Sequence, residues 1–282
     1  PSVFIMGFLL RKPMVQSRSP GGTAPNHSIP ITPDFPPPRK GRFPPPAWAG
    51  VVPARGLCYN GDTSRGNQIM EGKFMKIVAI NGSPRKNGNT AQVLEVVRRE
   101  VEAAGVEFQV FQPGAKVHPC MACYHCLNTG SLRCVQTDDM VNDIIAACIE
   151  ADGILLAAPV YHGGIAGGMK CVLDRLMLAA GCGVNQLHHK VGGALCTLRR
   201  SGSMETYQQL LGTMDAMEMV IVTSDYWGAV HGADPGEVQG DTEGMEVAAK
   251  LGRNMAWMVK VLAESKIPVP ETHPRTMTNF IR

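Results

Sequence analysis

Four cysteines lie close together in the middle of the chain, as Cys120, Cys123, Cys126 and Cys134. Spacers of two, two and seven residues let the thiolates converge on one small object, so the spacing indicates a metal or cluster site. Zinc is one alternative, although zinc sites usually separate two cysteine pairs by a longer segment. Reduced thiols that hold no metal are the plain structural alternative.

A polar segment at 81–90 follows a short apolar stretch and precedes a helical pattern. Backbone N–H groups at such a strand-to-helix turn point outward, and the helix N-terminus adds a partial positive charge, so the turn suits a phosphate. The segment matches neither a Walker loop nor a GxGxxG motif, and an ordinary polar turn with a helix cap is the alternative. The side chains that we expect at the phosphate are Ser83, Arg85, Asn87, Asn89 and Thr90.

A second candidate loop follows the third expected strand. Its glycines let the backbone approach the edge of a flat heterocycle, while Tyr161 and His162 offer surface and a hydrogen-bonding group. In a sheet of order 2-1-3-4-5, strands one and three flank the point where FMN binds in flavodoxin-like folds. A purely structural role is the alternative for His162. The residues that we expect at the ring are Pro159, Val160, Tyr161, His162 and Gly163.

The elements that must position these loops alternate between strand and helix from Met75 onward, and the cysteine run reads as a loop among them. Five strands with intervening helices indicate an α/β fold with a doubly wound, five-stranded parallel sheet. The expected strands cover 76–81, 106–111, 153–158, 190–197 and 219–223. The expected helices cover 89–104, 139–150, 166–179, 204–217 and 242–264.

Residues 1–74 differ from the rest of the chain. They hold 13 of the 21 prolines and nine Lys/Arg against three Asp/Glu, without apolar periodicity. One interpretation is a disordered, basic, Pro-rich tail. The other, which we prefer, is non-native upstream translation, because Met70-Glu71-Gly72 could be encoded by a stretch that resembles a ribosome-binding site before a start at Met75. Residues 75–282 are then one domain, in which the cysteine run is an insertion.

Composition excludes several classes of protein. Residues 75–282 carry 18 Lys/Arg against 21 Asp/Glu, which gives no support to nucleic-acid binding. No apolar run reaches the roughly 18 residues of a membrane span, and no export signal is evident, so we expect a cytoplasmic protein. Nine cysteines in 282 residues do not suggest a disulfide scaffold. The thiols expected to be buried and inert are Cys148, Cys171, Cys182 and Cys196.

From Met75 onward the sequence resembles the NADPH-dependent FMN reductase superfamily of flavodoxin-like proteins. More narrowly, it is similar to the iron–sulfur flavoproteins of anaerobic archaea and bacteria. This resemblance implies FMN, with its phosphate at the first loop and its ring at the second, and a [4Fe–4S] cluster on the four cysteines. A third loop at 197–203 matches loosely and adds Arg199 and Gly202 as candidates. The resemblance rests on 82–90, the cysteine run, Asp138-Asp139-Met140, Pro159-Val160-Tyr161, Met169-Lys170 and Asp174-Arg175.

The resemblance implies an oxidoreductase that transfers electrons between ferredoxin or NAD(P)H and a small acceptor, and a homo-oligomer, either a dimer or a tetramer. No side chain need act as an acid or base, because the cofactors carry the chemistry. One alternative is a cluster-free NAD(P)H:FMN or quinone reductase. The other is a non-catalytic electron carrier or zinc-binding module.

Overall fold

The computed structural model describes residues 75–182 and 185–270. The two interpretations of residues 1–74, and the isolated Cys58, lie outside these described residues. The start at Met75 and the domain boundary there therefore stay predictions. Within the described ranges, no helix is long and apolar enough to cross a bilayer.

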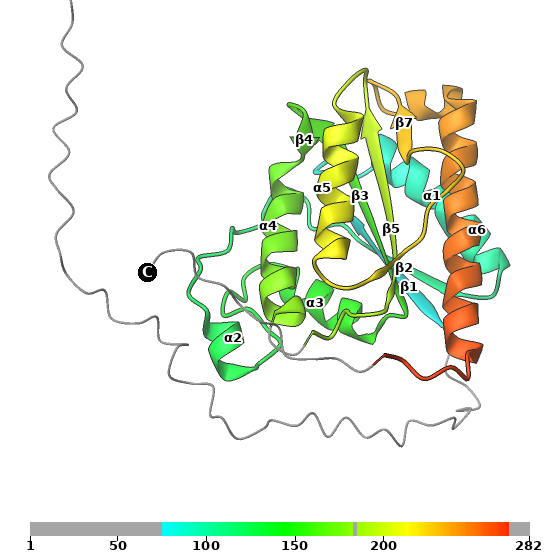
Figure 1. Cartoon of the computed structure of the whole chain (residues 1–282). Helices are drawn as coiled ribbons and strands as arrows, with labels where there is room; N and C mark the ends of the chain where they lie inside the picture. The colour runs from blue at the N-terminus through cyan, green and yellow to red at the C-terminus, as the bar shows by residue number, and fades with distance from the viewer. Residues whose placement is uncertain (1–74, 183–184, 271–282) are drawn as a thin grey trace, which may run out of the picture. The chain divides into compact units, whose positions relative to one another are not determined.

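A parallel sheet forms the centre of the described chain (Figure 1). Its main path runs β2-β1-β3-β5-β6, while β4 pairs antiparallel with β3 and β7 pairs parallel with β5. The flavodoxin-like order 2-1-3-4-5 is thus confirmed, but the sheet has seven strands where the sequence predicts five. The strands are β1 (Lys76–Asn81), β2 (Glu107–Phe111), β3 (Gly153–Tyr161), β4 (Gly164–Ile165), β5 (Val191–Leu198), β6 (Val220–Ile221) and β7 (Ala229–His231).

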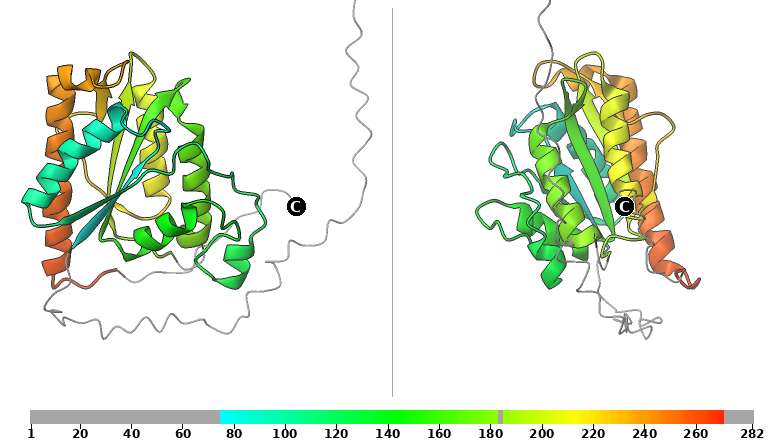
Figure 2. Two further views of the ribbon diagram at one scale, coloured as in Figure 1. Left: turned by 180° about the vertical axis from the view of Figure 1, so that it is seen from behind. Right: turned by 60° about the vertical axis from the view of Figure 1, so that its left-hand side comes forward.

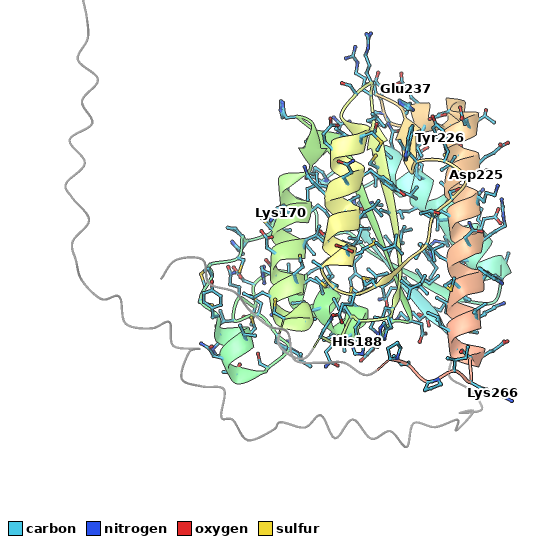
Figure 3. All side chains as sticks on the ribbon, viewed as in Figure 1. Lys170, His188, Asp225, Tyr226, Glu237 and Lys266 are labelled. Atoms are coloured by element: carbon cyan, nitrogen blue, oxygen red, sulfur yellow. The ribbon has the colours of Figure 1, made fainter. Side chains whose placement is uncertain are left out.

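The fifth position of the sheet is shared by two short strands. β6 pairs with the start of β5 and β7 with its end. Between them, residues 223–227 leave the sheet and run beside the last helix, where the Nζ of Lys250 lies 2.6 Å from Asp225 Oδ2 (Figure 3). The expected strand at 219–223 is therefore too long, and β7 was missed because three residues in a glycine-rich segment carry no recognisable period.

Helices cover both faces of the sheet (Figure 2). Successive side chains of β1 point to opposite faces of the sheet and so enter two different cores. Ile77 and Ala79 pack under α1 and α6, while Val78 and Ile80 pack under α3, α4 and α5. The helices are α1 (Asn89–Ala103), α2 (His125–Thr129), α3 (Val141–Glu150), α4 (Gly167–Leu176), α5 (Ser203–Asp215) and α6 (Thr242–Glu264), with a π-helical turn at Met177–Gly181 and a 3₁₀ turn at Glu237–Gly240.

One helix lies where the sequence predicts only a loop. α2 forms inside the cysteine run, between Tyr124 at φ 55° and Gly130 at φ 61°, both in the left-handed region. Five residues are too few to show a helical apolar period, so sequence patterning could not find it. α2 lies beside the C-terminal end of α4, whereas β4 lies at the N-terminal end of that helix (Figures 1 and 2).

The split fifth position depends on Gly228, whose carbonyl accepts the Cys196 N–H at 2.7 Å. A Cβ at this glycine would lie 2.5 Å from the backbone oxygen of Ala194, which cannot move aside cheaply. We therefore expect Gly228→Ala to lower the free energy of unfolding by about 1–3 kcal/mol, measured by urea and thermal unfolding.

The matched control is Gly212→Ala, on an exposed helical position where a Cβ meets nothing within 4 Å. Alanine is favoured over glycine in a helix by about 1 kcal/mol, so this variant is expected to be as stable as the parent protein or slightly more. Equal stability of both variants would contradict the assigned close packing at residue 228.

Candidate functional site

The loops singled out in the sequence meet at one edge of the sheet. Asn81 at the end of β1 pairs with Ala157 in β3, and Pro159 in β3 pairs with Thr197 in β5. Because these strands are parallel, their carboxyl ends and the loops that follow lie together. The structure thus brings the first, second and third candidate loops to a common edge.

The first loop is held in shape by its own side chains. Ser83 N–H donates to Asn81 Oδ1 at 3.0 Å, and Arg85 N–H donates to Ser83 Oγ at 3.2 Å. Gln112, which follows β2, donates from Nε2 to the carbonyls of Ser83 and Arg85 at 2.9 and 2.8 Å. Sequence reasoning missed Gln112, because nothing local marks a side chain that reaches a distant turn. Arg85 and Asn87 are left exposed to a ligand, whereas Ser83 is buried.

Two expected phosphate contacts use their side chains to join neighbouring loops. Asn89 donates from Nδ2 to Gly232 O at 2.9 Å and accepts the Gly236 N–H at 2.8 Å. Thr90 Oγ1 lies 2.7 Å from Thr197 Oγ1, so a hydroxyl bridge links α1 to β5. These bonds fix the N-terminus of α1 against the edge of the sheet. A role of Asn89 and Thr90 at a phosphate stays a prediction.

The second loop is a tight hairpin. His162 and Gly163 have φ of 50° and 77°, and Val160 pairs with Ile165 across the turn. Positive φ at both central residues is the mark of the two-residue turn that matches strand twist. Glycine accepts this conformation freely, and His162 is the less usual occupant. The turn leaves His162 and Gly163 exposed, with Tyr161 42% exposed beside them.

The third loop packs against this hairpin. Gly202 has φ of 88°, and a Cβ there would lie 2.9 Å from Val160 Cγ1 and 3.0 Å from Gly163 Cα. The hairpin is also fixed by Gln209 of α5, whose Oε1 accepts the Ile165 N–H at 3.2 Å. Sequence reasoning missed Gln209, which looks like any polar helix residue. Gly202 of the third loop therefore lies beside the second loop, and its role at a flavin stays a prediction.

Arg199 directly follows β5, next to the strand β7 that pairs with the end of β5. It lines an open hollow of about 520 Å³ together with residues around β7 and the start of α6. In this hollow His231 Nδ1 lies 3.2 Å from Asp241 Oδ2, and Asp241 Oδ1 accepts the Gly244 N–H that begins α6. Burial disfavours the Asp241 carboxylate, but the hydrogen bonds from His231 and Gly244 outweigh it and lower its pKa.

The cysteine run lies at the other end of α4 from the hairpin (Figure 1). Cys126 is buried, Cys120 and Cys134 are partly buried, and Cys123 is exposed. Ala122 has φ of 52°, and its N–H turns back to the Cys120 sulfur at 3.5 Å. Left-handed residues between the cysteines therefore fold the segment back on itself.

Neighbouring thiols of the run affect the pKa of Cys126. Burial raises the pKa of Cys126, and the nearby Cys134 and Cys120 raise it further, against the opposing backbone hydrogen bond at Leu127. In the described part of the chain, no three His, Cys, Asp or Glu side chains are grouped closely enough to hold a single metal ion. The donor set suits a [4Fe–4S] cluster by its chemistry, because each of the four thiolates binds a different iron and the ligands need not meet at one point.

A buried arginine closes the base of the cysteine run. The Arg175 side chain is 0% exposed and bonds to residues on both sides of the run. Its Nε donates to Cys134 Sγ at 3.2 Å, Nη2 donates to Gln136 O at 3.0 Å, and Nη1 donates to His118 O and to the Asp139 carboxylate. A buried guanidinium is stable only with such a full set of partners.

The charges of this pair are well defined. Burial disfavours the Asp139 carboxylate, but bonds from Arg175 and from the N–H groups of His118 and Val141 lower its pKa below the ordinary range. Burial likewise opposes the Arg175 charge, yet Asp139 and Cys134 raise its pKa. Asp139 also accepts the Val141 N–H at 3.1 Å, at the start of α3, although the N-cap position itself is Met140.

Asn142 of α3 fixes Cys134 from the other side. Its Oδ1 accepts the Cys134 N–H at 2.8 Å, and its Nδ2 donates to the carbonyls of Cys134 and Gln136 at 3.0 and 2.9 Å. Sequence reasoning did not mention Asn142, and it used Arg175 for the family resemblance without assigning it a contact. The available signal was an arginine on the apolar face of α4, next to the buried Val172 and Leu176.

The remaining cysteines divide into two groups. Cys148 and Cys196 are buried, as predicted, and burial raises the pKa of each to about 12, which disfavours the reactive thiolate. The prediction is wrong for Cys182, which is exposed, and Cys171 is only partly buried. Cys182 directly follows the π-helical turn, where the chain leaves α4.

Several known proteins resemble this chain in sequence. The sequence profile of the family described as NADPH-dependent FMN reductase matches residues 75–234. An iron-sulfur flavoprotein of Methanocaldococcus jannaschii is 34% identical over 197 residues, covering 67% of this chain and 99% of that protein. An iron-sulfur flavoprotein of Methanosarcina thermophila is 31% identical over 196 residues, covering 68% of this chain and 99% of that protein.

Among solved structures, RosB with a bound 8-demethyl-8-formylriboflavin-5'-phosphate intermediate has a similar fold. Its TM-score is 0.54 at 16% identity, over 74% of this chain and 94% of that one. The match to the family profile covers more than half of the chain, and it begins at the first strand of the sheet. The chain therefore belongs to the NADPH-dependent FMN reductase family, with iron-sulfur flavoproteins among its relatives, and is a flavin-dependent oxidoreductase.

Proposed function

We propose that this oxidoreductase combines FMN with a [4Fe–4S] cluster and transfers electrons between ferredoxin or NAD(P)H and a small acceptor. The observation that carries the cluster is the run of four cysteines, whose base is closed by the buried charge of Arg175. The names of the iron-sulfur flavoprotein relatives support it. In this proposal the ligands are Cys120, Cys123, Cys126 and Cys134.

The flavin belongs at the carboxyl edge of the sheet. Arg85 and Asn87 are exposed on the first loop, and the N-terminus of α1 beside them favours an anion. The hairpin, held by Gln209 and Gly202, offers an exposed surface to one side of a ring. The proposed FMN contacts are Ser83, Arg85, Asn87, Asn89, Thr90, Pro159, Val160, Tyr161, His162 and Gly163.

The protein's own part is to bind and orient. FMN exchanges electrons singly or in pairs and the cluster exchanges them singly, so together they would couple a two-electron partner to a one-electron partner. Gln112 and Asn81 hold the first loop in one shape before any ligand arrives. The hairpin turn at His162 and Gly163 does the same for the second, because its backbone is fixed by the strand pairing.

Two other functions remain as alternatives, each with its own outcome. A cluster-free NAD(P)H:FMN or quinone reductase would contain flavin without iron or sulfide. A non-catalytic electron carrier or zinc-binding module would show no turnover with either nicotinamide. The proposal also includes a homo-oligomer, a dimer or tetramer, in the cytoplasm, and an FMN-binding domain that begins at residue 75.

The phosphate assignment is tested with Arg85→Ala. Removing an exposed cation beside the phosphate is expected to weaken FMN binding about tenfold, or about 1.4 kcal/mol, and to leave riboflavin binding unchanged because riboflavin has no phosphate. Titration of the flavin-free protein with both ligands measures the two dissociation constants.

Lys86→Ala is the matched control, since Lys86 is the next residue, is also exposed and carries the same charge. It is expected to change FMN affinity by less than about twofold. An equal loss of FMN and riboflavin affinity in Arg85→Ala would mean that the loop had lost its shape, and the assignment to the phosphate would be wrong.

The ligand assignment is tested with Cys123→Ser, at the exposed cysteine of the run. Since a cubane needs four thiolates, the variant is expected to lose the broad visible absorbance of the cluster, with iron and sulfide, while it keeps FMN. Anaerobic purification, visible spectra and metal analysis give the readout.

Cys182→Ser is the control, because Cys182 is also exposed but lies outside the run. It should retain both cofactors. Cluster absorbance that persists in Cys123→Ser, or zinc in place of iron in the parent protein, would overturn the ligand assignment.

A further inference from the structure

We propose that Arg175 tunes the cluster through Cys134: its Nε–H···Sγ hydrogen bond makes Cys134 a charge-compensated ligand and raises the reduction potential of the cluster. The inference rests on the proposed cluster and goes beyond ligand identity. Arg175 would not touch iron, and it acts through the sulfur, so it is a positioning residue.

The contact is built to hold one atom in place. Nε of Arg175 lies 3.2 Å from Cys134 Sγ, and the guanidinium is held in place because Gln136 O, His118 O and the Asp139 carboxylate occupy three of its other four N–H donors. The Cys134 backbone is fixed independently by Asn142. Both ends of the N–H···S bond are therefore positioned before a cluster is present.

The bond also differs from the one at another cysteine of the run. The sulfur of Cys120 accepts a neutral backbone N–H, from Ala122 at 3.5 Å. At Cys134 the donor is a buried cation, and hydrogen bonds with an ionised donor are stronger than neutral ones. The side-chain amide of Gln136 also lies 3.9 Å from this sulfur, so donors gather at Cys134.

Reduction adds one electron to the cluster and increases the negative charge on its cysteine sulfurs. A donor aimed at a sulfur stabilises the reduced form more than the oxidised form, which raises the potential. Asp139 opposes this effect, because its carboxylate neutralises part of the guanidinium charge. The two residues of one buried ion pair should therefore move the potential in opposite directions.

The test compares Arg175→Met and Asp139→Asn with the parent protein by anaerobic redox titration. In Arg175→Met the ratio of reduced to oxidised cluster at a fixed potential is expected to fall at least tenfold, a shift of 59 mV or more to lower potential for one electron. In Asp139→Asn the shift is expected in the opposite direction. The FMN potential, read in the same titration, should not move in either variant.

A structural role alone gives a different pattern. Loss of loop order would affect both variants alike, as lower iron content or shifts of the same sign, and that outcome would overturn the inference. If Arg175→Met does not assemble a cluster, Arg175→Lys and Asp139→Asn are compared instead. Arg175→Lys keeps the positive charge but has no Nε–H to donate to Cys134. An unchanged cluster potential in both variants would overturn the inference. A parent protein without iron and sulfide after anaerobic reconstitution would instead refute the proposed cluster itself.

Discussion

The parallel pairing of β1, β3 and β5 is the constraint on which the candidate flavin site depends. Their register places Asn81 beside Ala157 and Pro159 beside Thr197, so three loops that are far apart in sequence leave the sheet together. Contacts between loops then follow at short range, such as the bridge from Thr90 to Thr197. A one-residue slip of a strand would move each of its side chains from one core to the other, so the packing of the two different cores fixes this register.

A second constraint is electrostatic. Arg175 lies on the apolar face of α4, where an unpaired charge would cost several kcal/mol, so the chain must cover it. Asp139 and carbonyls from both flanks of the cysteine run do so, and this closes the base of the run. At the other end of α4, Met169 packs so closely on Gly82 that a Cβ there would lie 2.7 Å away. One helix thus contacts both candidate cofactor loops. The two contacting residues, Met169 and Arg175, are about 9 Å apart along the helix axis at the usual rise per residue.

Much of the fold could be predicted because long elements carry their own signals. The five expected strands lie at the five positions of the sheet path, and the five expected helices all form. The misses are short or locally irregular: α2, the hairpin strand β4, and β7. Such segments have too few residues for a period, and their geometry is set by neighbours. The exposed Cys182 shows the same limit, since an apolar, glycine-rich neighbourhood does not by itself bury a side chain.

The sequence by itself determined the class of fold, the two loops at the strand ends and the spacing of the cysteines, because these depend on residue type and local period. Only the tertiary structure decided which polar side chains hold those loops. Asn89 and Gln112 bond to segments distant in the chain, and Arg175 reaches Cys134 from a helix 41 positions later. Such partners are specified by how helices and strands pack in three dimensions. A local sequence pattern does not show which residues distant in the chain will become neighbours.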